Sequence, residues 1–173
     1  MMVEANLIIT YDPAHAGSAK EEVDKVLKEI KQKAKHLKQD VDGIFNLRVK
    51  DAKKIVQQLL KLYKKKKGLF DKTFHWVPID KWCKATIAEM QKEIKKFNKI
   101  IKDKEKWKMD LGKRHTEKHE RDLIIKLTEV INKPKVDLEK PDKIIKVEII
   151  GNKAGIALLG KDELLNIPKL KGK

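Results

Sequence analysis

Two spacings of apolar residues alternate along the chain, and together they predict an α+β fold. Asn6 to Tyr11 is a short β-branched and apolar run that ends at Asp12, which predicts a buried strand followed by a turn. Apolar residues then recur at helical spacing from Val23 to Leu37, which predicts an amphipathic helix. Ser18 and Glu21 have the spacing of a capping box, so we expect the helix to begin at Ser18.

A second strand and a second helix follow in the same order. Val41 to Val49 predicts a strand, and Asp51 is placed to cap a helix whose apolar stripe runs from Ala52 to Tyr63. Thr73 to Ile79 predicts a further strand, in which Pro78 marks the end or a sheet edge. This order of elements predicts a small ferredoxin-like α+β unit.

The remaining residues predict a second α+β unit. Thr86 and Glu89 form another capping box, ahead of an apolar stripe that ends at Ile101. Residues 107–111 alternate between apolar and charged side chains, which predicts a half-buried strand. Three more elements are expected: a helix from Leu123 to Ile131 and the two strands of a hairpin, Ile144 to Ile150 and Ala154 to Leu159. No linker rich in Gly, Ser or Pro separates the halves, so we expect them to pack rigidly.

The charge balance is strongly basic. The chain of 173 residues has 42 basic and 26 acidic residues and a formal net charge of +16. A field of this sign attracts polyanions and releases counterions on meeting phosphates, so nucleic acid is the favoured partner class. A lysine-rich surface paired with glutamate, as in thermophilic proteins, or an anionic membrane are the alternatives.

Cys83 is the only cysteine, so an intrachain disulfide and a Cys-rich zinc site are both excluded. The first residues carry no basic segment followed by a long apolar run, and no stretch reaches about 18 apolar residues. We therefore expect a cytoplasmic protein with no membrane partner.

Each candidate catalytic motif lacks a residue that its chemistry requires. His115 and His119 have a spacing that suits one metal ion, but no cysteine or acidic cluster supplies a third ligand. His115 and Glu117 also match the His-x-Glu of zinc deaminases, which need a further pair of thiolates. Gly151 to Gly155 lacks the Gly-Lys-Ser/Thr ending of a P-loop. The sequence thus predicts no metal, no cofactor and no enzymatic activity of its own.

Clustered basic residues are the candidate RNA-binding positions. The first cluster occupies nine residues at a predicted strand-to-helix junction and consists of Lys113, Arg114, His115, Lys118 and Arg121. It holds two of the three arginines, and a helix N-terminus there adds backbone N–H donors for phosphate. The second cluster, at a helix end, is Lys64, Lys65, Lys66 and Lys67, although helix ends attract lysine in any case. Trp76, Trp82 and Phe74 would stack on unpaired nucleotides if exposed, whereas Trp107 is expected in the core.

The run from Trp107 to Leu159 resembles the THUMP domain. Its strand ends in Lys113 and Arg114, and the most specific part is the Val-Asp-Leu-x-x-Pro-Asp segment from Val136 to Asp142, ahead of the Ile-Lys-Val-Glu-Ile strand. The resemblance implies an N-terminal ferredoxin-like unit at 1–72 packed on a THUMP α/β domain at 73–168, with a basic tail at 169–173.

That resemblance also implies a function, because THUMP domains occur beside catalytic domains that modify tRNA. The expected partners are tRNA, gripped at its acceptor stem and 3′ end, and a separate modifying enzyme. The chain is most similar to stand-alone THUMP proteins, which implies an adaptor for a tRNA cytidine acetyltransferase that forms 4-acetylcytidine. The alternative is a non-enzymatic basic scaffold that binds another RNA or a protein.

Overall fold

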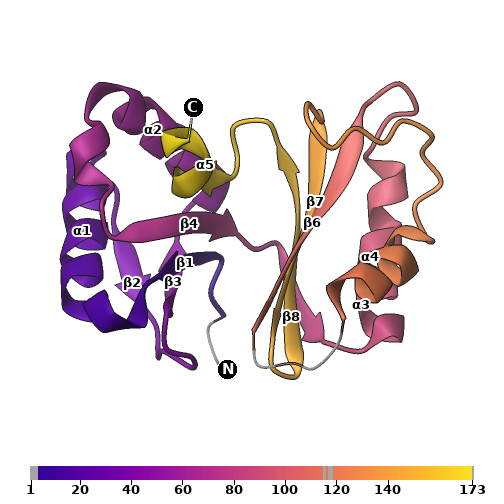
Figure 1. Ribbon diagram of the computed structural model, residues 1–173, viewed down its shortest axis with the longest axis horizontal. Helices are drawn as coiled ribbons and strands as arrows, with labels where there is room; N and C mark the ends of the chain where they lie inside the picture. Colours follow the sequence, from indigo (N-terminus) through magenta and orange to yellow (C-terminus); the bar gives the residue numbers. More distant parts are fainter. Residues whose placement is uncertain (1–3, 115, 117–118, 173) are drawn as a thin grey trace. The chain divides into compact units, whose positions relative to one another are not determined.

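The structure is a computed structural model that describes residues 4–114, 116 and 119–172. It contains two compact units, one formed by Met1–Ile79 together with Asp162–Lys173 and the other by Asp80–Lys161. In each unit helices cover one face of a β-sheet, as Figure 1 shows. The expected α+β class is confirmed.

The first unit is ferredoxin-like, as predicted. Its sheet has the strand order β2-β3-β1-β4-β9 with every neighbouring pair antiparallel. The first four strands and two helices follow the βαββαβ sequence of that fold, and β9 adds an edge strand. Its main elements are β1 (Leu7–Tyr11), α1 (Ala16–Glu29), β2 (Ala34–His36), β3 (Ile44–Val49), α2 (Ala52–Lys65), β4 (Thr73–Pro78), β9 (Leu165–Asn166) and α5 (Ile167–Lys171).

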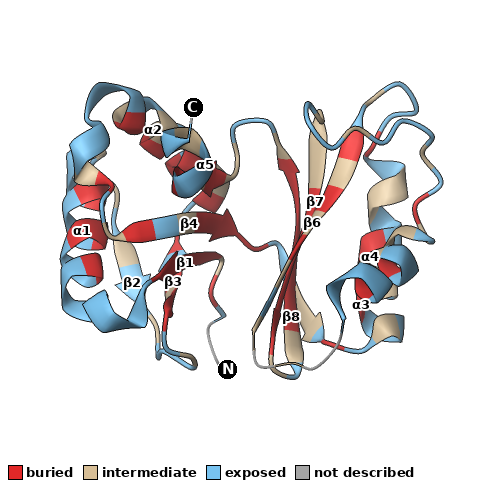
Figure 2. Ribbon diagram, in the orientation of Figure 1, coloured by how far each residue is buried: buried red, intermediate tan, exposed pale blue. Residues whose placement is uncertain are grey.

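The core of this unit lies between the sheet and helices α1 and α2. Leu7 and Ile9 of β1 face the helices and pack with Val23 of α1 and Ile55 of α2, all of them fully buried. The apolar stripes therefore mark the inner face of each helix, as the sequence predicts. Figure 2 shows the buried residues of the two helices facing the sheet.

Helix α1 is displaced from its predicted position at both ends. A 3₁₀ turn at Pro13–His15, capped by the carboxylate of Asp12, starts the helix at Ala16, so Ser18 lies inside it and caps nothing. At the other end Lys31 takes a left-handed backbone conformation with φ 57°. The amides of Lys31 and Gln32 then bond back to the carbonyls of Lys28 and Leu27, which closes the helix.

The second unit is a four-stranded sheet in the order β5-β8-β7-β6, in which β6 and β7 are parallel and the other pairs are antiparallel. The expected hairpin is present as β7 and β8, which turn at Gly151 with φ 62°. Its main elements are β5 (Lys81–Lys84), α3 (Ile87–Lys95), a 3₁₀ turn at Lys96–Lys99, β6 (Trp107–Arg114), α4 (Glu120–Thr128), β7 (Lys143–Ile150) and β8 (Lys153–Gly160).

Helices α3 and α4 cover one face of this sheet. Met90 and Ile94 of α3 and Leu127 of α4 pack against Met109 and Val147 of the sheet. Trp107 is buried in this core, as expected for a residue on the alternating apolar face, and its indole N–H donates to the Lys133 carbonyl. Among the described residues no helix is long and apolar enough to cross a membrane.

The unit boundaries differ from the predicted 1–72, 73–168 and 169–173. Strand Thr73–Pro78 pairs with β1 and belongs to the first unit, because its partners along the sheet edge lie there. Residues 162–168 also return to the first unit, where Leu165 is fully buried. The expected basic tail is instead mostly helix α5, whose Ile167 is buried in the same core.

Candidate nucleic-acid interface

The first basic cluster is divided by the pleat of β6. Trp107, Met109 and Leu111 face the helices, so Lys113 lies on that face and Arg114 lies on the opposite face. Lys113 is exposed and Arg114 is half-buried at the strand end. The structure therefore separates the two side chains that the sequence places in one phosphate contact.

The start of helix α4 adds little attraction for phosphate. Arg121 is exposed in its first turn, but Glu120 and Asp122 flank it and oppose an anion there. His119 occupies the N-cap position without a side-chain cap. His115 and Lys118 lie outside the described residues, so of this cluster the structure places Lys113, Arg114 and Arg121 only.

Strand pairing brings Arg114 together with two lysines that are distant in sequence. Arg114 pairs with Ile150, Ile150 with Lys153, and Lys153 with Lys84, so these four residues form one row across the sheet on the face away from the helices. We call this the basic row. At about 4.8 Å per strand it spans roughly 14 Å. Like charges directly opposite each other, such as Lys84 and Lys153, repel in the absence of an anion.

The next row of the sheet ends in one aromatic residue. It consists of Gly112, Glu148, Gly155 and Trp82. Trp82 is half-buried, and the ammonium of Lys153 lies 4.9 Å from the centre of its ring. A cation and an indole in contact on an edge strand suit the recognition of a phosphate next to a base.

A buried charge network lies beside these two rows. The ammonium of Lys146 is 2.8 Å from Glu148 and 3.3 Å from Asp110. Burial alone would lower the pKa of Lys146, but the two carboxylates outweigh it and raise that pKa above its usual value. The Glu148 carboxylate lies directly over Gly112, where an added Cβ would come within 2.4 Å of it. A side chain at this position would require the Glu148 carboxylate to move.

The other predicted contacts fall in the first unit. Lys64, Lys65, Lys66 and Lys67 are all exposed at the end of α2, and Lys66 forms an ion pair with Glu29 at 3.3 Å. Phe74 is exposed on β4. Trp76 cannot stack on a nucleotide, because it is fully buried and its indole N–H donates to the Thr73 hydroxyl. RNA binding by the four lysines stays a prediction.

No group of three or more His, Cys, Asp or Glu side chains within the described part of the chain is arranged to hold a metal ion. Cys83 is half-buried, and burial raises the pKa of its thiol, with a further increase from Glu93 and Glu89.

Comparison with known protein families identifies the second unit. The family model of the THUMP domain matches residues 84–159, which lie within Asp80–Lys161. The chain contains a THUMP domain. The match starts at Lys84, the last residue of β5, and ends in β8. It therefore includes all four residues of the basic row.

Solved structures show the same fold over both units. The chain resembles PH1313 from Pyrococcus horikoshii Ot3 with a TM-score of 0.64 and 15% identity over 92% of this chain and 54% of that one. TrmN from Thermus thermophilus has a TM-score of 0.57 and 11% identity over 90% of this chain and 46% of that one. A possible methylase from Clostridium difficile 630 has a TM-score of 0.56 and 11% identity over 90% of this chain and 41% of that one. The chain thus spans about half the length of these proteins. A search of curated protein sequences found no significant match.

Proposed function

We propose that this chain binds tRNA through its THUMP domain, with the basic row and Trp82 as the contact surface. THUMP domains are tRNA-binding modules of tRNA-modifying enzymes, and the family match over 84–159 is the observation that carries the proposal. The net charge of +16 supports a polyanionic ligand.

The geometry of the basic row supports recognition of a backbone and not of a base sequence. Arg114 offers a planar fork of donors to a phosphate, and Lys84 lies exposed at the other end of the same row. An A-form stem is recognised mainly by shape, phosphate and 2′-OH contacts. Trp82 supplies a ring on which an unpaired nucleotide at the end of such a stem can stack.

We further propose that the chain is an adaptor and that a separate enzyme, a tRNA cytidine acetyltransferase in the first instance, modifies the bound tRNA. The sequence supports this because it carries no P-loop and no dinucleotide fingerprint. Acetyl transfer would then require both proteins together.

The test is tRNA affinity over a range of salt concentrations for R114A/K84A. Loss of two charged contacts should weaken binding by about 2 to 4 kcal/mol, allowing for non-additivity. The slope of log K against log salt should fall by about one to two, because counterion release scales with the phosphates neutralised. The free energy of unfolding should change by less than about 0.5 kcal/mol.

K92A/K126A is the matched control, since both lysines are exposed on the helices that cover the other face of the same sheet. It removes the same charge and should leave the affinity close to that of the wild type. Equal affinity and equal salt slope for R114A/K84A and the wild type would exclude the basic row as the binding surface. Failure of the wild type to prefer tRNA over duplex DNA would exclude the proposed function itself.

A further inference from the structure

A second basic site lies at the opposite end of the THUMP sheet. Where β6 and β7 begin and β8 ends, Trp107 pairs with Lys143 and Lys143 with Gly160. A hollow of about 540 Å³ opens beside this row, and its lining consists of Lys102, Lys104, Glu105, Asp142, Lys143, Gly160 and Lys161. We call it the lysine hollow.

Both carboxylates of the lysine hollow are already engaged. Glu105 accepts hydrogen bonds from the Lys102 amide and from the Lys143 ammonium, both at 2.8 Å. The bond from Lys143, then the one from the Lys102 amide, holds the pKa of Glu105 below its usual value. Asp142 accepts from the Lys106 amide at 2.9 Å. Glu105 is thus paired with Lys143, whereas Asp142 holds the Lys106 backbone and keeps its negative charge in the lining.

Three lysines of the hollow lie outside its ion pairs, although the positive charge of Lys102 contributes to the lowered pKa of Glu105. The ammonium groups of Lys102, Lys104 and Lys161 form no ion pair with any carboxylate in the described part of the chain, and all three residues are exposed. Two neighbouring lysines outside the hollow are paired, Lys133 with Asp103 at 2.9 Å and Lys106 with Asp137 at 3.7 Å. The lining of the hollow as a whole has four lysines and two carboxylates, a formal charge of +2.

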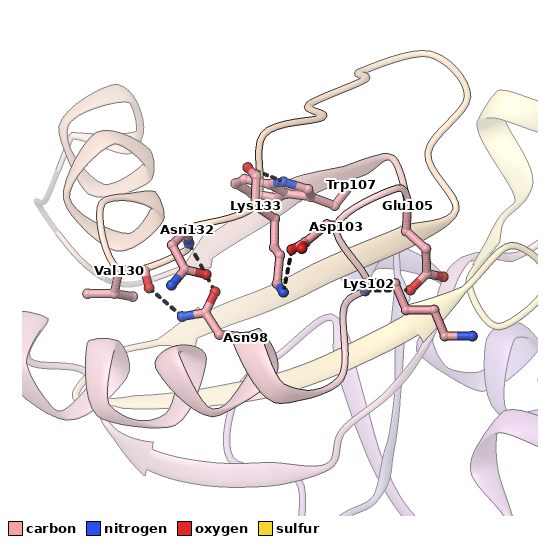
Figure 3. A network of polar contacts seen from close by, with 8 residues as sticks. All are labelled: Asn98, Lys102, Asp103, Glu105, Trp107, Val130, Asn132 and Lys133. Atoms are coloured by element: carbon pink, nitrogen blue, oxygen red, sulfur yellow. Dashed lines mark hydrogen bonds and ion pairs between the residues drawn. The ribbon is translucent and has the colours of Figure 1, made fainter.

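Polar contacts with the loop after α4 hold the segment that carries Lys102 and Lys104. Asn98 donates to the Val130 carbonyl at 2.7 Å and accepts from the Asn132 amide at 3.0 Å, which joins the 3₁₀ turn after α3 to the loop after α4. The ion pair between Lys133 and Asp103 ties that loop to the turn itself. Figure 3 shows this network, with the Lys102 side chain extending away from it. The lysines thus project from a fixed backbone, which reduces the entropy lost on binding.

We propose that the lysine hollow binds a phosphate group of the RNA held by the basic row, as a second and separate anchor. This inference rests on the proposed function. Lysine suits phosphate as a point charge, and a hollow lined by more ammonium groups than carboxylates attracts a phosphate. Seven residue steps of β6 at about 3.3 Å place the hollow roughly 23 Å from Arg114, so one phosphate cannot contact both sites.

The decisive variant is K102A/K104A/K161A, measured with tRNA at several salt concentrations. We expect affinity to fall about 10- to 100-fold and the salt slope to fall by about one, the value for one neutralised phosphate. Because the two sites are far apart, the effect should add to that of R114A/K84A on the free-energy scale. The control K92A/K95A/K126A removes three exposed lysines from α3 and α4 of the same unit and should change affinity less than about threefold.

Two RNA ligands distinguish the sources of the phosphate. Loss of the 5′-phosphate from the tRNA should weaken wild-type binding and leave the triple variant unchanged if a terminal phosphate occupies the hollow. If an internal phosphate occupies the hollow, the triple variant loses the same affinity for both RNAs. Either result supports the inference. It is overturned if the triple variant and its control bind tRNA equally while R114A/K84A is weakened, and that result leaves the proposed function intact.

Discussion

Glu22 is a buried acidic residue that organises the first unit. Its two carboxylate oxygens accept four hydrogen bonds at 2.6 to 2.8 Å, from the amides of Asp71, Lys72 and Thr73 and from the Thr73 hydroxyl. These bonds fasten helix α1 to the segment that leads into β4. A carboxylate is suited to this position because both of its oxygens act as acceptors.

We predict that E22Q lowers the free energy of unfolding by about 2 to 4 kcal/mol. The amide keeps one acceptor oxygen and presents an NH₂ group to donors that have lost their partner in a buried site. E21Q is the matched control, since Glu21 is the exposed neighbour on the same helix, and it should change stability by less than about 0.5 kcal/mol. Urea denaturation measures both variants. Equal midpoints for E22Q and E21Q would contradict the role assigned to Glu22.

No local pattern in the sequence marks Glu22 as buried, because its partners lie about fifty positions further along the chain. The basic row was hidden for the same reason. The local sequence marks Arg114 as one of few arginines and part of a basic cluster, but Lys84 and Lys153 share its row only through strand pairing. The alternation along residues 107–111 was already sufficient to place Lys113 and Arg114 on opposite faces.

Two of the three helix starts predicted from a capping residue agree with the structure, and the one at Ser18 does not. The predicted caps at Asp51 and Thr86 are confirmed, since each side chain accepts from the amide three residues later. Helix α1 was predicted too long, because Ala34 and Leu37 continue its apolar spacing beyond the actual end. The residue that ends the helix is a lysine in a left-handed conformation, where glycine is the usual signal.

This helix end leads to a prediction at the scale of the element. K31G should raise the free energy of unfolding by about 0.5 to 1 kcal/mol, because a side chain is strained at φ 57° and glycine is not. Lys31 is exposed, so little packing is lost.

K33G provides the comparison for K31G. Lys33 is also exposed in the loop after α1, and of the described residues other than glycine only Lys31 has a positive φ. K33G should therefore leave stability unchanged or lower it by a few tenths of a kcal/mol. Thermal denaturation compares the two variants, and a K31G variant less stable than K33G would argue against a left-handed Lys31.

The whole molecule is arranged as one unit inserted into another. The THUMP-containing unit is continuous in sequence, whereas the first unit needs residues from both sides of it. Strand β9 pairs with β4 through Leu165 and Trp76, and Ile167 of α5 is buried in the same core. The sequence did not reveal this return, because a two-residue strand and a five-residue helix are too short to show a period.

We predict that the two units differ in their ability to fold as fragments. Residues 80–161 should fold alone, whereas residues 1–79 should fold only when a peptide of residues 162–173 is added. Burial of Leu165 and Ile167 contributes roughly 3 to 6 kcal/mol, a large share of the stability of a small domain. Circular dichroism and the dispersion of amide NMR signals follow both fragments. Cooperative unfolding of 1–79 at the same midpoint with and without the peptide would contradict this prediction.

The insertion also fixes an order of events during biosynthesis. A ribosome adds about 5 to 20 residues per second, so the segment from residue 80 to residue 173 takes roughly 5 to 20 s to make after β4 has emerged. Throughout that time β4 is an open sheet edge with its later partner still missing. The second unit can therefore fold first, while β4 of the first unit keeps an edge that can pair with other nascent chains until β9 has been made.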